Sequence, residues 1–147
     1  MNFQKNKIFN PAADDSISKR TIIKGESTGL FNLGEVKYSW TKQMYQVMVG
    51  NFWVPEKVSG LTDDAAQYKN LTDNEKRAYK GIISFLTFLD SIQTVNLPNL
   101  SDFVTSSDVN LLLSIQSFQE AIHSQSYTTI LETVVSATER HEIYYYW

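Results

Sequence analysis

The sequence contains no cysteine, and this absence removes several kinds of chemistry at once. Without thiols the chain forms no disulfide, no thiolate metal site and no cysteine nucleophile. Any metal here must be bound without cysteine sulfur. The absence also suits a reducing compartment, and we expect a cytoplasmic protein.

A long, uninterrupted apolar run is also missing. The most apolar segment, "GIISFLTFLDSIQTV", is broken by Asp90, well short of the roughly 20 residues that a membrane span requires. The first residues, "MNFQKNKIFNPAADD", have no apolar core of the signal-peptide type. We therefore expect a soluble protein with no membrane partner.

Positive charge is not concentrated along the chain. The 13 basic residues are outnumbered by 16 acidic ones, and no Lys/Arg stripe is visible. Nucleic-acid binding normally shows such a stripe, so we expect no nucleic-acid partner. With 147 residues and 42% hydrophobic content, the chain has the size and composition of one globular domain.

The amino-terminal part differs from the rest. Residues 1–34 are polar and interrupted by glycines, which predicts an extended arm with a short strand at residues 20–24. Apolar residues at three- and four-residue steps then predict a helix over residues 35–52, followed by a turn region around Pro55. We expect residues 35–147 to form the folded domain.

Two long helices follow. Thr72 and Glu75 have the spacing of a capping box, which predicts a helix over residues 73–97 that stops before Pro98. A second helix is expected over residues 108–136. The chain is therefore predicted to be all-α.

Both long helices lack a clear polar face. Between Gly81 and Val95 of the first the only charge is Asp90, and between Val109 and Val135 of the second the only formal charges are Glu120 and Glu132. A helix that is apolar nearly all round belongs inside a bundle. We therefore expect Asp90, Glu120 and His123 to lie where water is scarce.

Buried carboxylates need compensation, which leaves a structural hydrogen-bond network or a metal site. Glu120 and His123 are three residues apart, so both side chains can converge on one ion. Glu-x-x-His is the dinuclear metal motif of ferritin-like bundles, although on an arbitrary helix it usually forms a surface salt bridge. Asp90 on the preceding helix is a candidate further ligand.

Tyr127 lies one turn beyond His123 on the same predicted face. A phenol so close to a redox-active metal can be oxidised by it. The alternative is a core tyrosine whose hydroxyl has an ordinary hydrogen-bond partner.

Four segments, "NFWVPEKV", "LTDNEK", "FLDSIQ" and "QEAIHSQSY", occur in an order that closely resembles the small, radical-generating (beta) subunit of class I ribonucleotide reductase. The resemblance covers roughly residues 30–147. It implies a ferritin-like helical bundle with a dinuclear metal centre, which uses oxygen to make a tyrosyl radical. The large subunit then uses the radical equivalent to reduce ribonucleotides to deoxyribonucleotides.

The resemblance also implies roles for single residues. Asp90 matches the first metal ligand, Glu120 the bridging carboxylate and His123 the terminal imidazole. Tyr127 matches the radical tyrosine. Trp53 matches the tryptophan that carries electrons between the surface and the metal, whereas without the resemblance it reads as a structural aromatic residue. Iron (2 Fe) is the expected metal, with manganese or a mixed Mn/Fe pair as alternatives.

The family site also needs another Glu and a second Glu-x-x-His from two further helices. This sequence has no second Glu-x-x-His, and after His123 its only glutamates are Glu132, Glu139 and Glu142. The segment "ERHEIYYYW" contains His141 but matches no metal motif, and residues 137–147 read as a turn or an exposed helix. We therefore expect this chain to form only the N-terminal half of the bundle.

Three explanations of the missing ligands remain: a small subunit split into two polypeptides, a fragment, or self-association. We favour the first. The expected partners are a second polypeptide that supplies the Glu and the Glu-x-x-His, the large subunit, and a second copy of the completed small subunit. Alternative functions are another ferritin-like carboxylate-bridged metal oxidase and a metal-free helical interaction protein.

Overall fold

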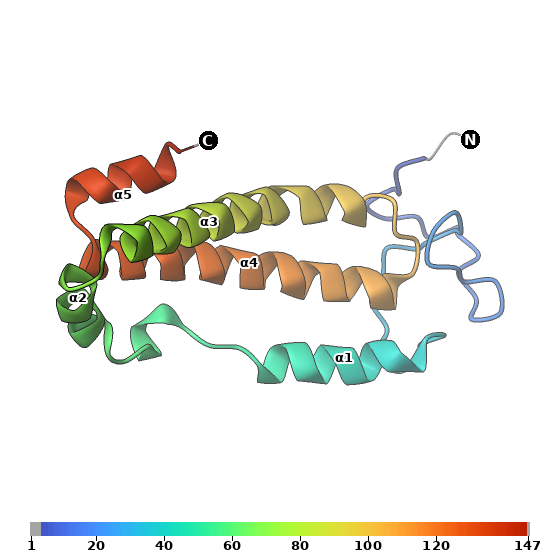
Figure 1. Ribbon diagram of the computed structural model, residues 1–147. Coiled ribbons are helices and arrows are strands. Elements are labelled where there is room, and N and C mark those ends of the chain that lie inside the picture. Colours follow the sequence, from blue (N-terminus) through green and yellow to red (C-terminus); the bar gives the residue numbers. More distant parts are fainter. Residues whose placement is uncertain (1–3, 147) are drawn as a thin grey trace. The chain divides into compact units, whose positions relative to one another are not determined.

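The computed structural model describes residues 4–146, which form five α-helices and one short 3-10 helix. In chain order they are α1 (Ser39–Gly50), η1 (Pro55–Lys57), α2 (Leu61–Lys69), α3 (Asp73–Ser101), α4 (Ser107–Val134) and α5 (Ala137–Tyr144) (Figure 1). Within residues 4–146 the only β pairing is an isolated antiparallel bridge between Ile23 and Val104. The predicted all-α fold class is confirmed.

The chain divides into two compact units. The first, here called the arm unit, combines the residues up to Phe52 with Val95–Phe118. The second, here called the site unit, combines Trp53–Thr94 with the residues from Gln119 onward. Asp90 and the Glu-x-x-His segment both belong to the site unit.

Residues 4–34 of the arm unit contain no helix. The strand predicted at residues 20–24 was wrong, because only Ile23 pairs, with Val104. The segment is anchored instead by Arg20, which is 6% exposed. Its guanidinium donates to the Glu35 backbone carbonyl at 2.8 Å and to the Asp15 carboxylate at 3.1 Å. The division into an arm (1–34) and a domain (35–147) stays a prediction.

The start of α3 follows the sequence prediction closely. Glu75 Oε2 accepts a hydrogen bond from the Thr72 backbone N–H at 2.7 Å, and Thr72 Oγ1 accepts one from the Glu75 N–H at 3.4 Å. These reciprocal bonds form the capping box and satisfy backbone donors that the first helical turn leaves unpaired.

The end of α3 differs from the prediction. The helix continues through Pro98 to Ser101, so the expected stop before Pro98 was wrong. Proline's fixed φ is compatible with a helix, and the residue removes one backbone donor and crowds one turn. The neighbouring Leu97 is only 4% exposed, and its burial helps to offset that cost.

Short helices occupy two segments that the sequence did not assign to a helix outright. η1 and the beginning of α2 lie in the predicted turn region around Pro55, and α5 occupies most of residues 137–147, which read as a turn or an exposed helix. Ser136 caps α5: its Oγ accepts from the Glu139 N–H at 3.3 Å, and Glu139 Oε2 accepts from the Ser136 N–H at 3.1 Å. A second capping box therefore starts this helix.

The core of the site unit joins α2, α4, α5 and the turn after α4. Its buried members are Tyr68, Leu131, Val134, Val135 and Ile143. In Figure 1, α5 lies along the first part of α3, and there the Ser84 hydroxyl donates to the Ile143 carbonyl at 2.9 Å. The helix α5 thus ties α3 to the end of α4.

Large apolar side chains remain exposed on the part of α3 that belongs to the site unit. They are Ile82, Phe85, Phe88 and Ile92. The sequence predicted a helix enclosed on all sides, and the described residues do not enclose this face. An apolar surface of this kind is typical of a protein contact.

Membrane insertion finds no support in the described helices. None of the helices between residues 4 and 146 has both the length and the apolar character needed to cross a bilayer.

Glu139 links α5 to α2 in the site unit. Besides capping α5, its Oε1 accepts a hydrogen bond from the Tyr68 hydroxyl at 2.8 Å. Burial alone would raise the pKa of Glu139, but the hydrogen bonds from Ser136 and Tyr68 and the charge of Lys80 outweigh it and hold this pKa below its ordinary value.

We predict that Glu139→Ala lowers the free energy of unfolding at neutral pH by about 1–3 kcal/mol, because Ser136 and Tyr68 lose their partner together. A carboxyl whose folded-state pKa is depressed stabilises the fold above its unfolded pKa of about 4.3, and this contribution is lost as the pH falls through the folded-state value. The difference in free energy of unfolding between Glu139→Ala and the unmodified chain should therefore become smaller in acid. Urea unfolding followed by circular dichroism measures both effects.

The matched control is Glu132→Ala, at an exposed position of α4, with an expected change within about 0.5 kcal/mol. Equal losses in the two variants, or a difference that does not narrow in acid, would contradict the assigned role of Glu139.

Candidate metal centre and its aromatic neighbours

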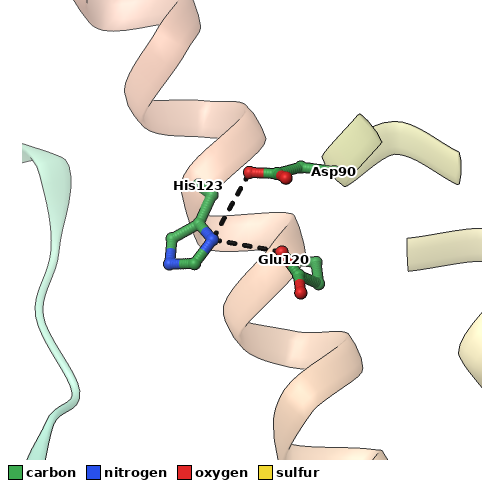
Figure 2. Close-up of side chains that lie close together, drawn as sticks. All are labelled: Asp90, Glu120 and His123. Carbon is green, nitrogen blue, oxygen red and sulfur yellow. Dashed lines mark hydrogen bonds and ion pairs between the residues drawn. The ribbon is translucent and has the colours of Figure 1, made fainter. Parts of the chain in front are cut away.

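Three potential metal ligands come together from two helices of the site unit. Asp90 comes from α3, and Glu120 and His123 come from consecutive turns of α4 (Figure 2). One ligand atom of each residue lies within 4.8 Å of the ligand atoms of the other two. The structure therefore brings together the three side chains that the sequence analysis selected as ligands.

The imidazole stands between the two carboxylates. His123 Nδ1 is 3.1 Å from Glu120 Oε2 and 3.4 Å from Asp90 Oδ2, as the dashed lines in Figure 2 show. The side chains of Asp90 and Glu120 are each 14% exposed, whereas that of His123 is 35% exposed. The carboxylates are thus largely removed from water, as predicted, and the imidazole less so.

This donor set fits a transition-metal ion. Two carboxylates and one imidazole supply oxygen and nitrogen atoms, which iron and manganese both accept. Carboxylates held away from solvent also gain from a cation, because burial makes their unpaired charge costly.

Tyr127 contacts the same group of side chains. Its hydroxyl donates a hydrogen bond to Asp90 Oδ2 at 2.8 Å. The pKa of Tyr127 is raised well above its ordinary value by burial, by this hydrogen bond, and by the negative charges of Asp90 and Glu120. The phenol is therefore held in its protonated form beside the carboxylate.

Trp53 lies against the site from the segment that precedes η1. Its ring stacks on the His123 imidazole, with the ring centroids 5.9 Å apart and the planes inclined by 26°. The indole is 39% exposed, so it contacts both His123 and solvent. All five residues singled out in the sequence thus lie in one neighbourhood of the site unit, and their roles stay predictions.

Two residues missed in the sequence analysis help to hold Trp53 there. Glu56 Oε1 accepts a hydrogen bond from the Gln125 side chain of α4 at 3.3 Å, and the adjacent Pro55 is buried. The segment around Trp53 therefore contacts α4 at Gln125 as well as at His123. Because Glu56 and Gln125 are far apart in the chain, no local pattern signals this contact.

Comparison with known proteins identifies the family. The model described as "Ribonucleotide reductase, small chain" matches residues 30–147. The chain belongs to this family. The family resemblance seen in the sequence is therefore confirmed.

Individual relatives agree with the family match. The "Ribonucleoside-diphosphate reductase subunit beta" of Treponema pallidum is 45% identical over 98% of this chain, and the match covers 41% of that relative's length. The R2 subunit of ribonucleotide reductase from Clostridium botulinum superposes on all of this chain with a TM-score of 0.93 and 44% identity, and the match covers 45% of that structure. This chain thus has the fold of a ferritin-like small subunit over less than half of the relatives' length.

A more distant structure shows the fold alone. The dimanganese(II)-NrdF of Streptococcus sanguinis has a TM-score of 0.72 and 22% identity over 78% of this chain, and 41% of that structure is covered. The manganese in its name belongs to that protein.

We predict that His123 shields Trp53 from solvent. In a Trp40→Phe, Trp147→Phe background, Trp53 is the only fluorophore of its kind, since the sequence has three tryptophans. His123→Ala removes the stacked ring, so Trp53 emission should shift to longer wavelength and become more easily quenched by acrylamide. His141→Ala is the matched control, because the second histidine stacks on Tyr145. The same response in both variants would argue against the Trp53–His123 contact.

Proposed function

We propose that this chain contributes Asp90, Glu120 and His123 to the dinuclear metal centre of a ribonucleotide reductase small subunit, with Tyr127 as its radical residue. The observation that supports this most directly is the Tyr127–Asp90 hydrogen bond of 2.8 Å. It joins an oxidisable phenol to one member of a cluster of three potential ligands. We propose iron as the metal, with manganese or a mixed pair as the alternatives that metal analysis distinguishes.

The donor count supports a further part of the proposal. Three side chains are too few to hold two ions in the family's manner, which uses a second Glu and a second Glu-x-x-His. Since the 147 residues contain no second Glu-x-x-His, we propose that the remaining donors lie outside them. A second polypeptide that carries these donors is the arrangement tested below. The open apolar face of α3, described above, is consistent with further helices packing on this chain.

The residues of this chain have distinct tasks in the proposed reaction. A metal pair held by these ligands would supply the oxidising power once it has reacted with oxygen. Tyr127 would give up one electron to that pair, and its proton would move along the existing hydrogen bond to Asp90 Oδ2. The low exposure of Asp90 limits the access of water to the carboxylate that accepts the Tyr127 hydrogen bond. A neutral, hydrogen-bonded phenol is a suitable starting state, because the proton acceptor is already in place.

Trp53 provides the proposed connection to the surface. Its ring touches His123 on one side and solvent on the other. In the assembled enzyme, a dimer of completed small subunits would deliver the radical equivalent to the large subunit, which reduces the ribonucleotide.

The decisive test mixes this chain with a polypeptide that carries the missing Glu and Glu-x-x-His, together with iron or manganese and oxygen. We predict an electron paramagnetic resonance signal of a tyrosyl radical that neither polypeptide gives alone. Tyr127→Phe should abolish that signal and leave the metal content unchanged. Tyr145→Phe, at an exposed position of the same chain, should leave both unchanged.

A radical signal that survives in Tyr127→Phe would exclude Tyr127 as the radical residue. A full dinuclear centre in this chain alone would contradict the proposal that a second polypeptide supplies the remaining donors. Metal uptake and oxygen consumption without any radical would instead favour another carboxylate-bridged oxidase, and no metal uptake at all would favour a metal-free interaction protein.

A separate prediction concerns electron transfer. Trp53→Phe should spare metal loading but lower nucleotide reduction by the assembled enzyme, because phenylalanine is much harder to oxidise than tryptophan. Trp40→Phe is the control, since Trp40 belongs to α1 of the arm unit. Turnover that is unchanged in Trp53→Phe would remove this residue from the pathway.

A further inference from the structure

The segment that carries Trp53 contacts α4 through two side chains. The Trp53 indole stacks on the His123 imidazole, and the Glu56 carboxylate accepts a hydrogen bond from the Gln125 side chain at 3.3 Å. His123 and Gln125 are two residues apart on α4, and Trp53 and Glu56 are three residues apart in their segment. The proposed radical chemistry gives tasks to Trp53 and His123 but none to Glu56 or Gln125.

The backbone between Trp53 and Glu56 is conformationally restricted. Pro55 has a fixed φ, and Val54 is extended, with φ −128° and ψ 144°, as expected for the residue before a proline. The Lys57 N–H then donates to the Val54 carbonyl at 3.0 Å and closes the 3-10 turn of η1. A contact that fixes Glu56 therefore also limits where Trp53 can lie.

The stacked pair of rings is not enclosed by other side chains. The indole of Trp53 is 39% exposed, and the side chain of His123 is 35% exposed. Burial therefore fixes the indole only in part, because apolar contacts stabilise in proportion to the area removed from water. Pro55 is buried, but one buried point still lets the segment turn about it. The hydrogen bond at Glu56 supplies a second point on α4.

We propose that Glu56 and Gln125 are positioning residues that keep Trp53 stacked on His123 and so keep the proposed electron path continuous. The inference rests on the proposed function, because only there does the stack carry an electron. Both residues act through Trp53, and neither binds the metal or is oxidised. The acceptor is a carboxylate, which favours the hydrogen bond, although its length of 3.3 Å makes it a modest one. Its loss should shift the position of Trp53 and leave the fold intact.

The fluorescence of Trp53 tests the positioning without any metal. In the background described above, where Trp53 is the only tryptophan, Gln125→Ala should lower the ratio of stacked to unstacked indole by about fivefold, the factor that one net hydrogen bond is worth. The emission should move to longer wavelength, and quenching by acrylamide should increase toward the values of His123→Ala. Gln67→Ala, at an exposed position of α2, is the matched control and should leave both unchanged.

An exchange of the two side chains separates the hydrogen bond from a general effect of substitution. Gln125→Glu brings two carboxylates together, and their repulsion should unstack Trp53 at least as much as Gln125→Ala does. The double variant Glu56→Gln, Gln125→Glu exchanges donor and acceptor and should restore the emission of the unmodified chain. Circular dichroism checks that each variant keeps its helices. Unchanged emission in Gln125→Ala, or a double variant that stays as unstacked as Gln125→Glu, would overturn the proposal.

Nucleotide reduction by the assembled enzyme tests the link to electron transfer. Gln125→Ala should lower turnover at unchanged metal content, and the double variant should regain it. If Trp53→Phe lowers turnover and an unstacked Gln125→Ala does not, the positioning role is overturned while the electron path stands. If Trp53→Phe leaves turnover unchanged, the electron path itself fails, and this inference fails with it, whatever the fluorescence shows.

Discussion

One carboxylate oxygen organises the candidate metal centre. Asp90 Oδ2 accepts a hydrogen bond from the Tyr127 hydroxyl at 2.8 Å and lies 3.4 Å from His123 Nδ1. Asp90 belongs to α3, whereas Tyr127 and His123 belong to α4, so these contacts exist only while the two helices keep their relative position along the axis. A slip of a single residue would displace Asp90 by about 1.5 Å and break both contacts.

The core of the site unit supplies that constraint. Leu131 is fully buried one turn beyond Tyr127, and the α5 helix binds α3 through the Ser84 hydroxyl and the Ile143 carbonyl. Closely packed side chains in a protein interior do not slide continuously past one another. The polar site therefore depends on apolar contacts several residues away from it, and substitutions there should affect the ligands without touching them.

Short sequence patterns correctly predicted features that depend only on residues within one helix. The Glu120 and His123 spacing placed both side chains on one face, because three residues span almost one helical turn. The approach of Asp90 could be expected only from its burial and from the family resemblance, since no local rule relates one helix to the next. The helix continues past Pro98, where the buried Leu97 helps to offset the lost backbone donor. For residues 137–147 the sequence left a turn and an exposed helix open, because this segment lacks an apolar period.

The partial exposure of Trp53 has a consequence for the lifetime of an oxidised Tyr127. Under the proposed function, Trp53 links the buried site to the surface, and its indole is 39% exposed. An open electron path does not discriminate among donors, so a small reductant that reaches this ring could discharge the radical as well as the intended partner. The lifetime of the Tyr127 radical would then depend on what covers the exposed edge of Trp53. A protein docked there would protect the radical from small reductants as well as exchange electrons with it.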